Sequence, residues 1–137
     1  MSTIYRVTPE ERVEGQPTEG ILREQAVRTD GMWSGFARTE PGMVSSWHHH
    51  GEYESSIYIL TGSLQMEFGP GGQDAFDASP GDFVFIGKGV VHRESNPSTE
   101  QGRWWWCVQG RASRPSTSMD PSRREMARRR AHVYSPA

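Results

Sequence analysis

The chain has only one cysteine, Cys107, among its 137 residues. A single cysteine excludes an internal disulfide and is usual in proteins of a reducing compartment. No run of 18 apolar residues occurs, so we expect no membrane-spanning helix. The first residues also lack the basic region followed by an apolar one that is typical of a secretory signal. These absences predict a cytoplasmic protein.

Acidic and basic residues are unevenly distributed. The net charge is −2 overall, but residues 1–110 carry 8 basic and 15 acidic groups, whereas residues 111–137 carry seven arginines against Asp120 and Glu125. A basic tail can bind nucleic acid or an acidic partner. Because the remainder is acidic and has no recognised nucleic-acid motif, we expect no nucleic-acid partner and favour packing of the tail on the body or on a second subunit.

Short β-type segments fill the middle of the chain. Fifteen glycines and nine prolines supply many turns, which suits short strands better than long helices. Nine strand candidates lie between Ile21 and Gly110, with connections of 2 to 7 residues. Several alternate apolar with polar residues, as Leu64, Met66 and Phe68 do. This pattern predicts an all-β antiparallel sandwich or barrel.

The 137 residues are expected to form one domain with an appendage at each end. Residues 1–19 are polar and predict an N-terminal arm, with one short strand at Ile4–Val7. Residues 20–110 predict the barrel. Residues 111–137 predict a basic tail, in which Asp120 and Pro121 resemble a helix start and residues 122–133 could continue a short helix.

The residues with the clearest chemistry are His48, His50, Glu54 and His92. Imidazole nitrogens and a carboxylate oxygen are ligands for first-row divalent metals. Residues two apart in a strand face the same side, so His48 and His50 would point into a site together while His49 points away. The set suits Fe, Mn, Ni, Co or Zn. We therefore predict one divalent transition metal, with no ligand from the tail.

The residues around these histidines form two motifs. The first runs GMVSSWHHHGEYESSIYILTG from Gly42, the second runs GDFVFIGKGVVHRESN from Gly81, and 18 residues separate them. Together they resemble the two signature motifs of the cupin superfamily over Gly42–Asn96, about two-fifths of the chain. The resemblance implies a small double-stranded β-helix, or jelly-roll, barrel whose interior holds the histidines.

Two positions depart from the family pattern. Gly87 stands where the second motif usually has proline. The first motif usually has six residues between its glutamate and its closing glycine, and Glu54 has seven before Gly62. Counting back from Gly62 puts Ser55 at that position. A carboxylate is a much better metal ligand than a hydroxyl, so we predict Glu54 as ligand, with a small bulge after it. A regular strand would instead leave three histidines plus water.

The resemblance also sets the functional expectation. It implies a metal-dependent small-molecule enzyme of oxygenase, isomerase, lyase or cyclase type, and a homodimer. The alternative is a non-catalytic protein that binds a metal or a small ligand. Since one fold supports many reactions, the fold does not select among them.

Aromatic residues give two further candidates. Tyr58 could donate a proton or a hydrogen bond to a bound anion, although a core aromatic is the better interpretation. In a strand, Trp104 and Trp106 would face one side and Trp105 the other, together with Cys107. We interpret this run as barrel core on one side and dimer interface on the other.

Overall fold

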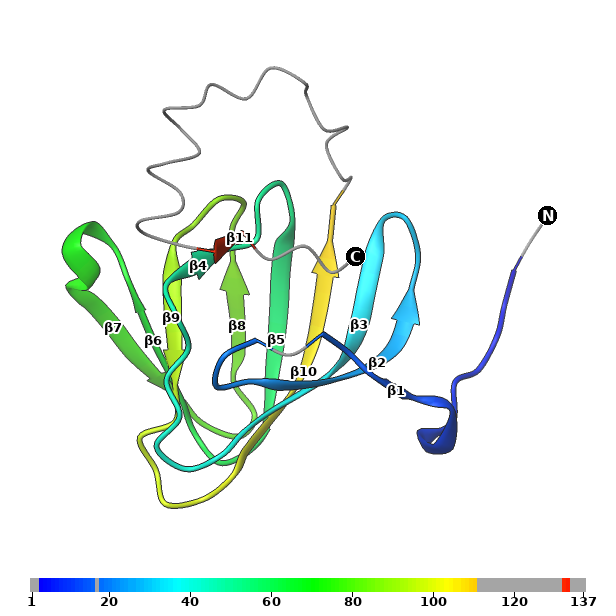
Figure 1. The fold of residues 1–137 in the computed structure, drawn as a ribbon, viewed down its shortest axis with the longest axis horizontal. Helices are drawn as coiled ribbons and strands as arrows, with labels where there is room; N and C mark the ends of the chain where they lie inside the picture. Colours follow the sequence, from blue (N-terminus) through cyan, green and yellow to red (C-terminus); the bar gives the residue numbers. More distant parts are fainter. Residues whose placement is uncertain (1–2, 17, 111–131, 134–137) are drawn as a thin grey trace.

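The computed structural model describes residues 3–16, 18–110 and 132–133. Two β-sheets of six and five strands curve around a common interior, and Figure 1 shows β6, β7 and β9 on its left with β2, β3 and β10 on its right. The strands are β1 (Val13–Glu14), β2 (Leu22–Arg28), β3 (Met32–Thr39), β4 (His48–His49), β5 (Glu54–Thr61), β6 (Leu64–Phe68), β7 (Asp74–Ala78), β8 (Phe83–Ile86), β9 (His92–Ser95), β10 (Gly102–Gln109) and β11 (His132–Val133).

The strand order identifies the architecture. The larger sheet runs β1-β2-β3-β10-β5-β8 and the smaller one β11-β4-β9-β6-β7. Neighbours in the sheets are antiparallel except β11 and β4, which are parallel. Two short 3₁₀ turns, Pro9–Glu11 and Pro70–Gly72, are the helical segments of the described residues. This arrangement confirms the predicted all-β jelly-roll barrel.

Alternation along the strands creates the core. β10 is buried at Trp104, Trp106 and Val108 and only partly covered at Trp105 and Cys107, as the sequence pattern predicts. The Trp106 ring lies 5.1 Å from that of Trp33, and the buried apolar cluster includes residues of both sheets. Burying such aromatic rings supplies much of the apolar area that stabilises a small domain.

A tight turn joins β5 to β6. Gly62 has a φ of 71° there, and a Cβ at this position would lie 2.7 Å from the carbonyl oxygen of Gln101. The left-handed conformation and the close approach of the backbone both require glycine. This turn closes the first sequence motif and fixes how β5 enters the sheet.

Two details differ from the sequence predictions. Residues 4–7 form no strand, and the arm instead pairs through β1, where Val13 and Glu14 oppose Gln25 and Glu24. Most of the predicted C-terminal helix lies outside the described residues, but its expected end, His132–Val133, forms β11. No helix in the described residues is long and apolar enough to cross a membrane.

The position of β11 links the tail to the barrel. Its backbone pairs with β4 in parallel register, with His132 opposite His48 and Val133 opposite His49. β4 would otherwise be the edge of the smaller sheet. Covering an edge strand satisfies its backbone hydrogen-bonding groups and removes a site of unwanted pairing.

We expect a chain ending at Ala131 to keep the barrel but to melt roughly 5 °C lower, because losing this short ladder costs about 1 kcal/mol. Thermal unfolding followed by circular dichroism measures the change. A chain ending at Val133 is the matched control and should melt as the full chain does. Equal melting of both shortened chains would show that β11 does not stabilise the barrel.

Candidate metal centre

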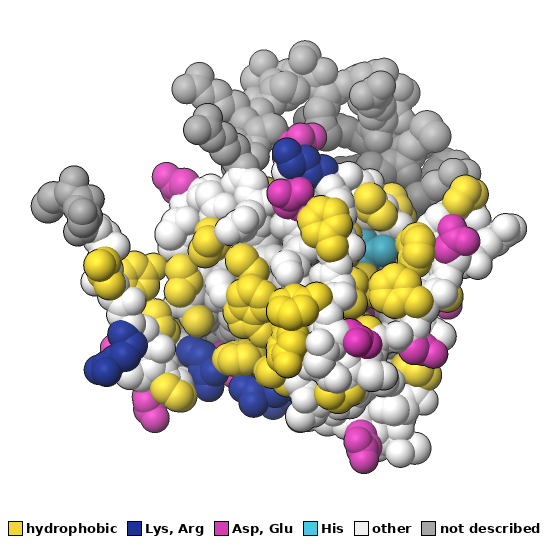
Figure 2. Space-filling view, turned by 180° about the vertical axis from the view of Figure 1, so that it is seen from behind, with side chains coloured by type: hydrophobic (Ala, Val, Ile, Leu, Met, Phe, Trp, Pro, Cys, Tyr) yellow, Lys and Arg dark blue, Asp and Glu magenta, His cyan; other side chains and the backbone are white. Residues whose placement is uncertain are grey.

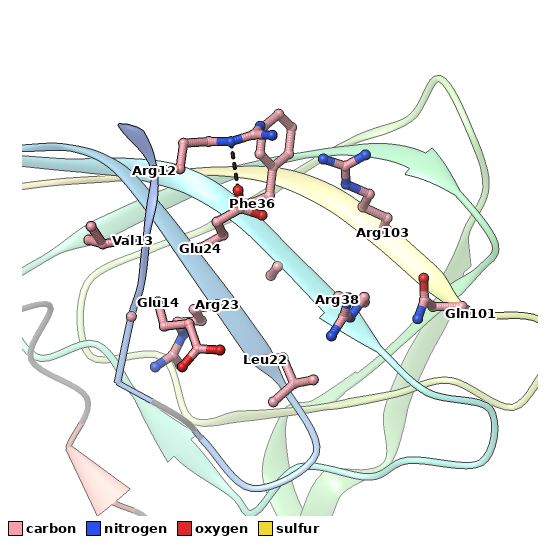
Figure 3. Close-up of a pocket in the computed structure, with 12 residues that line it drawn as sticks. Arg12, Val13, Glu14, Leu22, Arg23, Glu24, Phe36, Arg38, Gln101 and Arg103 are labelled. Carbon is pink, nitrogen blue, oxygen red and sulfur yellow. Dashed lines mark ion pairs between the residues drawn. The ribbon is translucent and has the colours of Figure 1, made fainter. Parts of the chain in front are cut away.

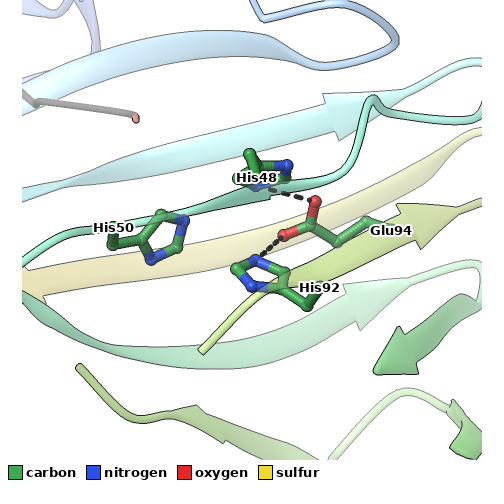
Figure 4. Close-up of side chains that lie close together, drawn as sticks. All are labelled: His48, His50, His92 and Glu94. Carbon is green, nitrogen blue, oxygen red and sulfur yellow. Dashed lines mark hydrogen bonds and ion pairs between the residues drawn. The ribbon is translucent and has the colours of Figure 1, made fainter. Parts of the chain in front are cut away.

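Four buried side chains meet inside the barrel: His48, His50, His92 and Glu94. The exposed fraction of each is 4% or less. One nitrogen from each imidazole and one carboxylate oxygen all lie within 4.8 Å of one another. Figure 4 shows the three rings grouped around the carboxylate, with dashed lines joining it to His48 and His92.

Strand pairing brings these residues together. β4 pairs with β9 in antiparallel register, and His48 lies directly opposite His92. His50 follows two residues after His48 and Glu94 two residues after His92, so alternation points all four to the interior. His49 is less buried than its two neighbours. The predicted inward direction of His48 and His50 is confirmed.

Hydrogen bonds fix the orientation of the imidazole rings. The Nδ1 atoms of His48 and His92 lie 2.7 Å and 2.8 Å from the carbonyl oxygens of Ser46 and Val90. A carbonyl only accepts, so both Nδ1 atoms carry hydrogen. The Nδ1 of His50 lies 2.7 Å from the hydroxyl of the buried Ser55. For His48 and His92, hydrogen at Nδ1 leaves Nε2 of the neutral ring as the electron-pair donor. The hydroxyl of Ser55 can donate or accept, so it orients the His50 ring without fixing its tautomer.

The carboxylate faces these Nε2 atoms directly. Glu94 Oε1 lies 3.1 Å from Nε2 of His92, and its Oε2 lies 3.3 Å from Nε2 of His48. The hydroxyl of Ser45 also donates to Oε2. A neutral ring with hydrogen on Nδ1 has no hydrogen on Nε2. Such an Nε2 and a carboxylate oxygen are both hydrogen-bond acceptors, so they repel each other. The arrangement therefore calls for a positive charge between them, either a proton or a metal ion.

Burial and mutual charge set the protonation states. Burial alone would raise the pKa of Glu94, but the hydrogen bond from His92 and the nearby histidines hold that pKa well below its usual range. Burial alone would lower the pKa of His92, but the hydrogen bond to Glu94 and the charge of Glu94 outweigh burial and raise that pKa. Burial, reinforced by the charge of His92, lowers the pKa of His50 to about 3. The cluster thus holds an ionised carboxylate beside a neutral imidazole.

The space at the cluster is small. A cavity lined by His48, His50 and Glu94 has an accessible volume of about 10 Å³, close to what one water molecule needs. A larger pocket of about 680 Å³ shares Arg23 and Ala37 with this lining and opens among residues of β1, β2, β3 and β10 (Figure 3). The donor set and the space together fit one metal ion.

Glu54 does not join the cluster, so the prediction that it faces the histidines is wrong. It is exposed at the start of β5, while Ser55 is buried and contacts His50. Ser55 therefore occupies the inward position that counting back from Gly62 indicates. The physical reason is alternation, since one residue along a strand reverses the direction of the side chain.

β5 contains a bulge, but not directly after Glu54. Its pairing with β10 is regular from Glu54 to Ile59, and the register then shifts, so that Arg103 pairs with Thr61 and Leu60 is the additional residue. The bulge predicted directly after Glu54 thus lies six residues later. A bulge at Leu60 leaves the parity of Glu54 and Ser55 unchanged.

Tyr58 also lies away from the cluster. It is on the outer face of β5, partly exposed, and its ring packs 4.8 Å from that of Phe83. The structure therefore contradicts a catalytic position for Tyr58 at this site.

The sequence interpretation missed Glu94. The available signal was the spacing His92-x-Glu94, which repeats the parity of His48-x-His50 within a second predicted strand. A carboxylate two residues after a candidate ligand shares its face, and the structure shows that arrangement.

With this geometry established, comparison with known proteins gives the family. The model of the family described as "Cupin domain" matches residues 35–108, more than half of the chain. The chain belongs to the cupin family. No curated protein sequence matches it.

Solved structures share the fold at low sequence identity. The polyketide cyclase RemF from Streptomyces resistomycificus matches with a TM-score of 0.66 and 18% identity over 92% of this chain and 94% of its own. A predicted oxalate decarboxylase from Thermotoga maritima gives 0.66 and 14% over 77% and 99%. KdgF from a Halomonas species gives 0.64 and 17% over 77% and 94%. Such identities establish the fold alone.

We expect Glu94→Gln to weaken binding of Zn²⁺ or Mn²⁺ at least about 100-fold, because a buried charged oxygen ligand becomes a neutral amide. Competition with a chromophoric chelator measures the affinity. Glu54→Gln makes the same chemical change on the outer face and should leave the affinity unchanged. A similar loss in both variants would contradict the assignment of Glu94 to the centre.

Proposed function

We propose that this cupin is a metal-dependent enzyme acting on a small organic molecule, with one divalent transition metal held by His48, His50, His92 and Glu94. The observation that carries the proposal is the convergence of three imidazoles on one buried carboxylate within 4.8 Å. Burial of an ionised group is costly unless a positive partner compensates it. A metal ion provides that compensation for the whole cluster.

Some residues of the proposed centre present ligand atoms, and others hold those residues in orientation. His48, His50 and His92 present Nε2, while Ser46, Ser55 and Val90 hold the opposite ring nitrogens. Such outer contacts fix the ring direction and raise ligand basicity. Ser45 holds Glu94 in the same way.

A bound divalent metal supplies Lewis-acid catalysis, and redox chemistry with oxygen if it is iron. Three nitrogens and one oxygen suit Fe, Mn, Ni, Co or Zn. No cysteine belongs to the set, whereas closed structural zinc sites usually include cysteine. These ligand types support a catalytic centre of oxygenase, isomerase, lyase or cyclase type. The names of the cyclase RemF and of the predicted decarboxylase also support a small-molecule substrate.

A second candidate function is non-catalytic binding of a metal or small ligand. The observation that favours it is the accessible volume of about 10 Å³ at the cluster, which leaves little room for a substrate beside the metal. An enzyme would have to admit its substrate by displacing the side chains that line this space.

Elemental analysis of protein purified without an affinity tag or chelator is the first test. We expect about one transition-metal ion for each chain. Turnover then separates the two candidates. Incubation with a mixture of small carboxylic acids, sugars and phenols, followed by mass spectrometry, should show a metal-dependent product for an enzyme. Ligand-induced stabilisation without any product would support the binding protein instead.

Alanine substitutions test each ligand in turn. We expect His48→Ala, His50→Ala and His92→Ala each to lose most bound metal, because each removes a converging Nε2. His49→Ala is the control, since its ring points away from the cluster and its variant should retain the metal. Metal content by inductively coupled plasma mass spectrometry measures the outcome. Loss of metal in His49→Ala equal to that in His50→Ala would contradict the site.

A further inference from the structure

An arginine is buried beside the candidate metal centre. Arg23 of β2 is 5% exposed and lines the same small cavity as His48, His50 and Glu94. Burial is the main reason that the pKa values of His48 and His50 are lowered, and the positive charge of Arg23 lowers both further. Because arginine stays protonated in proteins, Arg23 is a permanent positive charge at the cluster.

A hydrogen bond and a ring contact hold the guanidinium of Arg23. Its Nη1 donates to the carbonyl oxygen of Gln16 at 2.9 Å, and its central carbon lies 4.8 Å from the centre of the Trp106 ring. The same ring lies 5.5 Å from the ring of His50. The planar fork of N–H groups in a guanidinium matches the two oxygens of a carboxylate. Trp106 therefore places a group suited to binding carboxylates next to a candidate metal ligand.

The larger pocket that adjoins Arg23 is rich in arginine. Arg23 and Ala37 line both this pocket of about 680 Å³ and the small cavity at the cluster. Four of the eight basic residues within 1–110 line the pocket, against two of the fifteen acidic ones. These residues are Arg12, Arg23, Arg38, Arg103, Glu14 and Glu24. The pocket is therefore positively charged, although residues 1–110 are acidic as a whole.

The positive charge of this pocket is only partly neutralised. The Nε of Arg12 lies 2.6 Å from a carboxylate oxygen of Glu24, but that of Arg38 lies 3.9 Å from the nearest oxygen of Glu40. Among the described residues, no carboxylate lies within ion-pair distance of Arg103. Figure 2 shows most of the visible Lys and Arg side chains together at the lower left of one face, with Asp and Glu scattered over it. A positive pocket of this kind attracts anions.

We propose that the substrate carries a carboxylate group, which the arginines of the larger pocket attract and which Arg23 binds beside the candidate metal ligands. This substrate class rests on the metal-dependent enzyme proposed above, and its reason is charge. Glu94 offsets one of the two positive charges of a divalent ion, the histidines are neutral as ligands, and Arg23 adds a further positive charge. A carboxylate compensates this excess, whereas a neutral group does not.

The sizes of the two spaces suit such a substrate. The cavity at the cluster, about 10 Å³, is too small for an organic molecule, whereas the larger pocket lies within the ~300–1,000 Å³ that is typical of small-molecule sites. Because Arg23 lines both, a carboxylate at Arg23 can face the cluster while the rest of the molecule lies in the larger pocket. A planar carboxylate is also smaller than a tetrahedral phosphate, so the narrow space favours the carboxylate.

Calorimetric titration of the full chain loaded with Zn²⁺ tests the substrate class. The probes are three carboxylic acids, each with its amide as the neutral counterpart: lactate and lactamide, succinate and succinamide, benzoate and benzamide. We expect at least one acid to bind at least about 30-fold more tightly than its amide, because a guanidinium binds an ionised acceptor more strongly. Equal binding of every acid and its amide, or no binding by any acid, would overturn the proposal. Tighter binding of inorganic phosphate than of every acid would do the same.

Substitution of Arg23 tests the residue itself. Arg23→Gln should remove the preference for acid over amide, because the positive charge is lost. Arg23→Lys keeps the charge without the fork of N–H groups, so it should weaken acid binding about tenfold and retain the preference. The lysine variant also decides the matter if circular dichroism shows that Arg23→Gln does not fold.

Arg28→Gln is the matched control for these variants. Arg28 is exposed at the end of the same strand and does not line the pocket, so this variant should bind acids as the wild type does. An acid preference that survives in Arg23→Gln would contradict the assignment. Acid binding that is unchanged in Arg23→Lys, or equally weakened in Arg28→Gln, would contradict it too.

Association kinetics test the attraction by the pocket. Arg103→Gln should slow binding of the preferred acid roughly threefold at low salt and by less at about 0.5 M salt, because salt screens the field of exposed charges. Stopped-flow measurement of tryptophan fluorescence follows the binding, since Trp106 contacts Arg23. An unchanged rate at low salt would show that the pocket does not attract the acid.

Metal content distinguishes failure of this substrate class from failure of the metal centre. Arg23 is not among the four candidate ligands, so Arg23→Gln should bind as much metal as the wild type. If metal is bound and no acid is preferred, the substrate class is wrong and the metal centre stands. If no metal is bound, the metal centre is wrong, and titration of the metal-free chain decides by the same criteria whether Arg23 binds acids.

Discussion

The constraint on which the interior depends is the burial of one ionised carboxylate among three imidazoles. Glu94 keeps its charge because the histidines lower its pKa, and backbone or hydroxyl contacts at Nδ1 turn the Nε2 atoms toward it. Without the histidines, Glu94 would be a buried charge with no partner, which costs several kcal/mol. The pairing of β4 with β9 places these groups opposite each other, so the register of a very short strand pair determines the chemistry of the centre.

The sequence predicted the parts of the structure that depend on strand periodicity. The positions of most strands along residues 20–110 follow from turn residues and alternation. The inward direction of His48 and His50 and the opposite directions of Trp105 and Trp106 follow from alternation with a period of two. Glu54 was assigned wrongly because its direction depends on a single residue of register, and composition cannot locate a bulge. The bulge at Leu60 is set by pairing with β10, a long-range contact with no local signal. Glu94 had a local signal in its spacing from His92.

The carboxylate of the cluster does not come from the first motif. Ser55 stands where the first motif usually has glutamate and acts through His50, to which it is hydrogen-bonded. Glu94, on a different strand, provides the charge. The donor set of three nitrogens and one oxygen is therefore unchanged while its source in the chain differs. Because ligand type governs which metals bind, the proposed centre would suit the same metals although the motif departs from its usual form.

The same strands serve the interior and the outer surface. In β5, Ser55 supports His50 while its neighbours Glu54 and Ser56 belong to the outer face, and in β10 Trp106 packs in the core while Trp105 and Cys107 face outward. A shift of one residue in either strand would move an outer side chain into the cluster and expose a core ring. The bulge at Leu60 lies at the end of β5, beyond both sets of residues. The register that orients the centre therefore also determines which side chains of β5 and β10 face outward.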